Sequence, residues 1–144
     1  MKIAFIGQPN AGKSTIFNGL AGYKTVTANF PGQTVHYTVS KVKVGNETFE
    51  IVDLPGIYSL TALDMAELES RKYILSKQAD VVINVIDASA LSRSLELTLQ
   101  LAELQVPMVI CLNMMDEARK KGIEINKEKL SQIFGVPVIE TVAN

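Results

Sequence analysis

The chain has 144 residues, a size typical of one domain, and 47% of them are apolar, which is enough for a packed core. Its 14 basic residues nearly balance its 15 acidic residues, so no nucleic-acid partner is expected, and its single cysteine, Cys111, excludes an internal disulfide. No apolar run approaches the ~20 residues that a membrane-spanning helix needs, so the sequence predicts a soluble piece in the cytosol, with Cys111 as a small buried hydrophobe.

Apolar runs that alternate with helical patterns give the expected elements in chain order. Strands are expected over residues 2–6, 35–44, 48–53, 80–87, 107–113 and 137–141. Helices are expected over residues 14–22, 63–78, 90–105 and 126–134, from apolar spacing and from cap and stop signals. Residues 44–48 are typical of a hairpin turn, which makes one strand antiparallel. These patterns predict an α/β fold of three layers, with a mostly parallel six-stranded sheet and one antiparallel edge strand.

The first expected strand runs into GQPNAGKST, residues 7–15, which matches the phosphate-binding pattern G-x-x-x-x-G-K-S/T. Glycines allow backbone N–H groups to curl toward phosphate oxygens, and the following helix adds positive potential at its N-terminus. Lys13 would bring a charge to the outer phosphates, and Ser14 a hydroxyl to Mg²⁺. We expect this loop to hold a nucleoside triphosphate, with contacts from Gly7, Gln8, Pro9, Asn10, Ala11, Gly12, Lys13, Ser14 and Thr15.

Two later segments predict a site that senses the γ-phosphate. DLPG, residues 53–56, matches D-x-x-G, so Asp53 is expected to hold Mg²⁺ through water and the Gly56 N–H to reach the γ-phosphate. NFPGQTV, residues 29–35, occupies the place of the effector loop of GTPases, where the hydroxyl of Thr34 would bind Mg²⁺ and its N–H the γ-phosphate. Loss of that phosphate would release both loops. Two neighbours of Thr34, Gly32 and Gln33, are also expected to contact the nucleotide.

NMMD, residues 113–116, resembles the guanine-reading motif N-K-x-D of GTPases. Asp116 can accept hydrogen bonds from the ring N–H and the amine of guanine, whereas adenine would leave a buried polar group unpaired. Asn113 would tie the loop together and touch the base. Met114 replaces the lysine of the motif, so we expect weaker nucleotide binding and faster exchange. The segment TVA is a loose match to the last base-contacting loop, S-A-K/L, and adds Thr141, Val142 and Ala143.

Six segments of this chain together resemble the N-terminal G domain of the ferrous iron transport protein B family, a Ras-like domain among the Era-like P-loop GTPases. They are GQPNAGKSTIFNGLAG, ANFPGQTV, DLPGIYSLTA, VINVIDAS, LELTLQLAEL and LNMMDEA. The resemblance implies a single G domain over residues 1–144, truncated just after the last base-contacting loop and lacking the final helix. It also implies a switch controlling Fe²⁺ uptake at the cytoplasmic face of the inner membrane, joined to helical regulatory and membrane-transport domains.

The resemblance to GTPases also predicts slow hydrolysis. A glutamine just after D-x-x-G often orients the attacking water, but this chain has Ile57 there, followed by Tyr58. In Era-like GTPases with Pro-Asn in the phosphate loop, as at Pro9-Asn10 here, the asparagine helps to bind K⁺, whose charge would replace an arginine finger. The alternative is that Asn10 only tolerates a left-handed turn. The expected catalytic residues are Asn10, Lys13, Thr34 and Gly56.

Two other functions stay open on the sequence. An Era-like GTPase of ribosome or RNA maturation would share the phosphate loop, although the balanced charge and Met114 argue against it. A guanine-nucleotide sensor that does not hydrolyse GTP would share every binding residue. Turnover measured in K⁺ and in Na⁺ separates the sensor from the GTPase.

Overall fold

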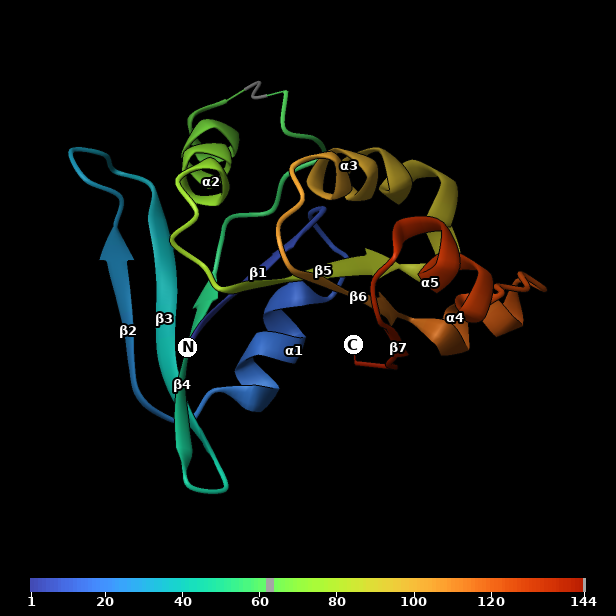
Figure 1. The fold of residues 1–144 in the computed structure, drawn as a ribbon, viewed down its shortest axis with the longest axis horizontal. Coiled ribbons are helices and arrows are strands. Elements are labelled where there is room, and N and C mark those ends of the chain that lie inside the picture. The colour runs from blue at the N-terminus through green and yellow to red at the C-terminus, as the bar shows by residue number, and fades with distance from the viewer. Residues whose placement is uncertain (62–63, 144) are drawn as a thin grey trace.

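A computed structural model describes residues 1–61 and 64–143 of the chain. A seven-stranded sheet forms its centre, in the order β2-β3-β4-β1-β5-β6-β7 (Figure 1). The strands are β1 (Lys2–Gly7), β2 (Tyr23–Asn29), β3 (His36–Val44), β4 (Glu47–Asp53), β5 (Val81–Asp87), β6 (Met108–Asn113) and β7 (Val138–Glu140). The helices are α1 (Lys13–Leu20), α2 (Met65–Leu75), α3 (Leu91–Glu103), α4 (Met115–Lys120) and α5 (Lys127–Phe134), with a short 3₁₀ helix, η1 (Ala88–Ala90), before α3.

The strand directions bring the motifs to one edge of the sheet. Strands β4, β1, β5, β6 and β7 pair in parallel, whereas β3 runs antiparallel to both β2 and β4. Phe5 lies opposite Asp53, and Asp87 lies opposite Asn113, so the carboxyl ends of these strands meet. Ligands of open α/β sheets bind beyond such carboxyl ends.

Apolar side chains cover both faces of the sheet, which explains why its central strands consist of nearly continuous apolar runs. On one face, Phe17 of α1 meets Phe5 edge to face, with ring centroids 5.8 Å apart. On the other face, where Figure 1 shows α2 and α3, Ile6 and Val52 pack with Leu97 and other buried residues of the larger core. The neighbours Phe5 and Ile6 face opposite sides because side chains alternate along a strand.

The predicted three-layer α/β fold is confirmed, but the sheet has seven strands rather than six. Residues 23–29, for which no strand was expected, form β2 and pair with β3 at the edge. The antiparallel strand β3 is therefore second from the edge, so its predicted place at the edge was wrong. Helix α4 was also not expected, because six residues are too few to show a helical period.

The expected helix over residues 63–78 is shorter in the structure, where α2 spans Met65–Leu75 and residue 63 lies outside the described residues. Asp64 caps the helix, since its side chain accepts a hydrogen bond of 2.8 Å from the Glu67 N–H. In residues 1–61 and 64–143, no helix combines the length and apolar character that crossing a membrane requires. After β7 the structure describes only residues 141–143, where Val142 is 56% exposed.

Candidate functional site

The phosphate loop, residues 8–12, curls around a cavity between the end of β1 and the start of α1. Asn10 and Gly12 both have left-handed backbone conformations, with φ of 71° and 84°. Glycine is required at position 12, because a Cβ there would collide with the side-chain amide of Asn113. The cavity measures about 300 Å³ and is lined by Gln8, Pro9, Asn10, Gly12, Lys13, Ser14, Thr15 and Gly56.

Three polar side chains converge beside this cavity. The ammonium of Lys13, which is only 6% exposed, forms an ion pair with Asp53, and the Ser14 hydroxyl donates to Asp53 Oδ2 at 2.9 Å. A hydroxyl oxygen and a carboxylate oxygen within hydrogen-bond distance are hard ligands of the kind that Mg²⁺ prefers. The residues present therefore fit a magnesium site formed by Ser14 and Asp53.

The D-x-x-G segment lies directly on the phosphate loop. A Cβ added to Gly56 would lie 3.0 Å from the backbone nitrogen of Pro9, so only glycine fits without displacing the loop. The Ile57 N–H donates to the Gly7 carbonyl at 2.9 Å. The Ile57 side chain is fully buried in the larger core, whereas Tyr58 is 55% exposed. Position 57 therefore presents its backbone, and not its side chain, to the phosphate loop.

Asn113 joins three segments that are distant in sequence. Its side-chain Nδ2 donates to the Ala11 carbonyl at 3.0 Å and to the Ala143 carbonyl at 2.7 Å. Its Oδ1 accepts from the Thr141 hydroxyl at 2.8 Å. The side chain is completely buried, so every hydrogen-bonding atom that it carries needs such a partner. The phosphate loop and the TVA loop thus share one anchor.

Asp116 lies beside this anchor, in the first turn of α4. Within the described part of the chain, its buried Oδ1 has no hydrogen-bond partner. A buried acceptor without a partner costs about 1–3 kcal/mol, so such an atom is typical of a site that receives a donor from a ligand. Met114 precedes the helix in a left-handed conformation with φ of 61°. The assignment of both residues to the base stays a prediction.

The structure does not bring Thr34 to the phosphate cavity. Thr34 is exposed and makes no side-chain hydrogen bond to any described residue. The loop of residues 30–35 is closed by its own backbone bond from Phe30 N–H to the Val35 carbonyl, at 3.0 Å. Phe30 is buried, with its ring centroid 4.7 Å from that of Tyr37. Gln33 and Phe30 line a cavity with residues of α2, while Gly32 is exposed, so the roles of this loop's residues stay predictions.

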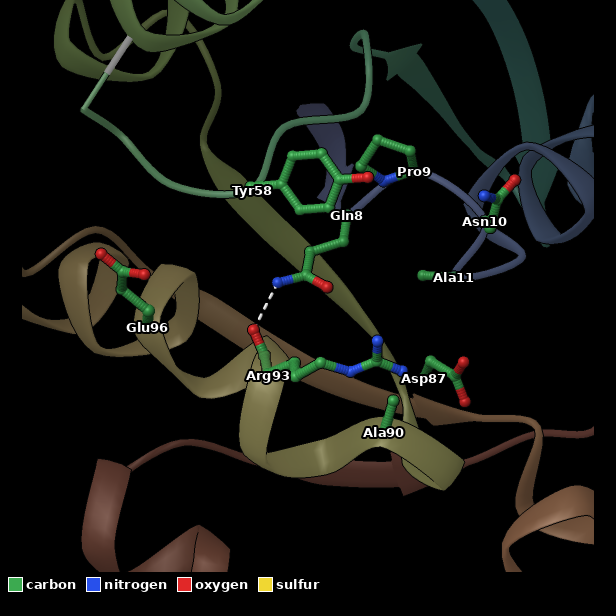
Figure 2. Close-up of a pocket in the computed structure, with 9 residues that line it drawn as sticks. All are labelled: Gln8, Pro9, Asn10, Ala11, Tyr58, Asp87, Ala90, Arg93 and Glu96. Atoms are coloured by element: carbon green, nitrogen blue, oxygen red, sulfur yellow. Dashed lines mark hydrogen bonds between the residues drawn. The ribbon is translucent and has the colours of Figure 1, made fainter. Parts of the chain in front are cut away.

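A second cavity, of about 330 Å³, lies on another side of the phosphate loop (Figure 2). Its lining combines polar and charged residues with apolar ones and comprises Gln8, Pro9, Asn10, Ala11, Tyr58, Asp87, Ala90, Arg93 and Glu96. The side-chain Nε2 of Gln8 donates across this cavity to the Arg93 carbonyl of α3, at 2.5 Å (Figure 2). Sequence reasoning missed α3 as part of the site, because glutamine and arginine on a helix surface carry no motif.

Glu67 is a second feature that the sequence did not indicate. It is only 5% exposed, and its Oε2 is buried without a partner among the residues described. Burial raises the pKa of its carboxyl group, nearby Asp64 raises it further, and a hydrogen bond from the Tyr58 backbone lowers it. Cys111 is buried as expected, and burial raises the pKa of its thiol. His36 is exposed at the start of β3.

A family model described as "Ferrous iron transport protein B" matches residues 1–144. The Fe(2+) transporter FeoB of Escherichia coli is 44% identical over 147 residues, covering 99% of this chain. A fusion of Fe(2+) transport protein A and FeoB from Porphyromonas gingivalis is 42% identical over 143 residues, again covering 99% of this chain. The chain spans only 19% and 17% of the lengths of these two relatives.

Solved structures show the same similarity in three dimensions. A mutant of S. thermophilus NFeoB bound to GDP superposes with a TM-score of 0.91 at 44% identity, covering 99% of this chain and 56% of that one. The G domain of T. maritima FeoB gives a TM-score of 0.90 at 36% identity, covering 99% of this chain and 87% of that one. The arrangement of loops described above is therefore that of FeoB G domains.

Proposed function

The chain belongs to the ferrous iron transport protein B family, and we propose that it is a guanine-nucleotide switch domain that binds GTP and GDP and hydrolyses GTP slowly. One observation carries this proposal. Asn113 joins the phosphate loop to the base loop, and next to it the buried Oδ1 of Asp116 has no partner among the described residues. A phosphate cavity and an acceptor for guanine thus lie on one edge of the sheet. The similarity to NFeoB bound to GDP supports the same ligand.

The ion pair of Lys13 with Asp53 explains how the protein tolerates a buried charge beside the phosphate cavity, because each group neutralises the other. We infer that the phosphates draw the Lys13 ammonium away from Asp53. The carboxylate of Asp53 and the hydroxyl of Ser14 would then hold Mg²⁺. When bound, this ion neutralises charge on the β- and γ-phosphates. The Gly56 N–H would contact the γ-phosphate from the other side of the phosphate loop. Thr34 would contact Mg²⁺ and the γ-phosphate after its loop moves.

Hydrolysis should be slow because neither of the two residues that follow Gly56 is placed to hold the attacking water. Ile57 is fully buried in the core, and Tyr58 turns toward the second cavity (Figure 2). We propose that Asn10, which lines the phosphate cavity, helps to hold K⁺ beside the phosphates. The left-handed conformation of Asn10 also fits the alternative, that asparagine is present only for the turn.

We also propose a role for the parent chain, which extends beyond the residues described. The names of the relatives support a part in Fe²⁺ transport, with this domain as a switch for a membrane-transport domain and a helical regulatory domain in the parent chain. Because GTP is a cytosolic metabolite, we place the domain at the cytoplasmic face of the membrane. Membership of the ferrous iron transport protein B family favours this role over one in ribosome or RNA maturation.

Turnover in two salts tests the proposal. We expect steady-state GTP hydrolysis to be roughly tenfold faster in K⁺ than in Na⁺, the size of a modest electrostatic contribution. Asn10→Ala should remove this gain and leave GDP affinity nearly unchanged. Asn46→Ala, in the exposed turn between β3 and β4, is the matched control and should keep it. Equal turnover in both salts excludes the K⁺ mechanism, and absence of turnover leaves the sensor function.

A further inference from the structure

Helix α3 is hydrogen-bonded to two loops of the candidate site, the phosphate loop and the D-x-x-G loop. In its first turn, the Arg93 carbonyl accepts a hydrogen bond of 2.5 Å from the side-chain amide of Gln8 in the phosphate loop (Figure 2). Two turns further along, Gln100 Oε1 accepts a hydrogen bond of 2.5 Å from the Leu60 N–H, four residues after Gly56. One helix therefore holds the phosphate loop and the D-x-x-G loop at two separate points.

The two glutamines have opposite roles as donor and acceptor. A backbone carbonyl can only accept, so Gln8 must present its NH₂ group to Arg93. A backbone N–H can only donate, so Gln100 must present its oxygen to Leu60. The orientation of both amides is thus fixed by the partner. A carboxylate, which only accepts, can replace Gln100 but not Gln8.

Helix α3 is itself fixed to the centre of the sheet. The Thr98 hydroxyl donates to Asn84 Oδ1 at 2.6 Å, and Asn84 Nδ2 lies 3.4 Å from the Ile6 carbonyl, next to the start of the phosphate loop. Thr98 and Asn84 are buried, as are Leu97 and Leu101 on the same helix. The helix is therefore a firm support, and a bond to it restrains the loop that makes the bond.

We propose that Gln8 and Gln100 are positioning residues for GTP binding and hydrolysis, acting through the two loops that α3 holds. This inference rests on the proposed GTPase function. Gln8 restrains the loop that would hold the phosphates common to GDP and GTP. Gln100 restrains the loop of Gly56, whose N–H only the γ-phosphate would contact. The two bonds should therefore affect different measured quantities.

Substitution of each glutamine by glutamate and by leucine tests the proposal. Gln100→Leu should lower kcat for GTP about two- to tenfold, the effect of one lost hydrogen bond, with unchanged GDP affinity. Gln100→Glu keeps the acceptor and should keep kcat within about twofold of the wild type. Gln8→Glu and Gln8→Leu both lose the donor, so both should weaken GDP and GTP binding about two- to tenfold. Gln132→Glu, exposed on α5, controls for the added charge.

Hydrogen exchange at the Leu60 amide gives a measurement that needs no nucleotide. In the wild type and Gln100→Glu this amide should be protected, and in Gln100→Leu it should exchange at least about threefold faster. If the wild type shows this protection but hydrolyses no GTP, the proposed function fails while the bond is confirmed. Equal kcat and equal exchange in Gln100→Glu and Gln100→Leu would overturn the inference, as would a loss of GDP affinity in Gln100→Leu.

Discussion

The two loops that would sense the γ-phosphate are held in very different ways. The loop of residues 54–60 is bonded to its neighbours, from Leu54 to the Phe5 carbonyl of β1 at 3.2 Å and from Ile57 to Gly7 at 2.9 Å. Further bonds reach it from Ser70 of α2 and from Gln100 of α3. The loop of residues 30–35 has backbone bonds within itself, and its Phe30 ring packs on Tyr37 of β3, whose ring neighbours Tyr73 of α2. The loop of residues 54–60 is thus bonded to three neighbouring elements, whereas the loop of residues 30–35 is held mainly by bonds within itself and by the packing of Phe30.

The difference in how the two loops are held determines which of them has to move when a nucleotide binds. Each hydrogen bond contributes a net of about 0.5–1.5 kcal/mol, so the bonds of the loop of residues 54–60 help to hold Gly56 beside Pro9. Thr34 can reach the phosphates only if its loop moves, and Phe30, which is 4% exposed, is then at risk of losing its packing. Complete burial of such a side chain is worth about 1.5–3 kcal/mol. Contacts of Thr34 with Mg²⁺ and the γ-phosphate would have to offset that loss.

The largest effect is expected at the predicted base-reading residue, which lies outside both of these loops. Asp116→Asn should weaken GTP binding at least about 100-fold and favour xanthosine triphosphate, because the amide donates where guanine also donates. Titration of the variant with GTP and with xanthosine triphosphate measures this change of specificity. Glu117→Gln, one residue further along α4, removes the same charge and should have little effect. Wild-type GTP affinity in Asp116→Asn would show that Asp116 does not read the base.

A smaller effect, on GTP turnover but not on GDP affinity, is expected from a substitution in the loop of residues 30–35. Thr34→Ala should leave GDP affinity within about twofold of the wild type, because the side chain lies outside the phosphate cavity in this structure. It should lower GTP turnover about tenfold or more, because a ligand formed only with GTP is lost. Fluorescent GDP titration and phosphate release measure the two quantities. Thr27→Ala, on the exposed edge strand β2, is the control, and an equal loss of GDP affinity in Thr34→Ala would contradict the comparison.

The local structure of the phosphate loop could be predicted from the sequence, whereas the resting place of the loop of residues 30–35 could not, for a physical reason. The phosphate loop depends on glycine conformations and on a lysine at fixed spacing, which are local properties of residues 7–15. The resting place of Thr34 depends on Phe30 reaching Tyr37, which is a tertiary contact. Strand β2 was missed because it gains its partners only from β3. The bond from Gln100 to Leu60 likewise joins segments 40 residues apart, and no local pattern encodes it.

The smallest predicted effect concerns the stability of the loop that is held in place. Glu67 accepts a hydrogen bond from the Tyr58 backbone, yet burial, with Asp64 nearby, raises the pKa of its carboxyl group above 4.5. A raised pKa in the folded protein means that its stabilising contribution is complete below the unfolded pKa and is lost as pH rises through the folded pKa. At neutral pH the buried carboxylate is therefore unfavourable, and Glu67→Gln should relieve it while keeping an acceptor for Tyr58.

We accordingly expect Glu67→Gln to raise Tm by about 1–3 °C at pH 7.5 and to change it less near pH 4, where the raised pKa favours the protonated carboxyl group of the wild type. Thermal unfolding of both proteins across this pH range measures the difference. Glu96→Gln, exposed on α3, controls for the loss of one negative charge. If Glu67→Gln instead lowered Tm more at pH 7.5 than at pH 4, the ionised carboxylate would be a favourable anchor for Tyr58. The loop of residues 54–60 would then be held by charge as well as by backbone bonds, and its contrast with the loop of residues 30–35 would be larger.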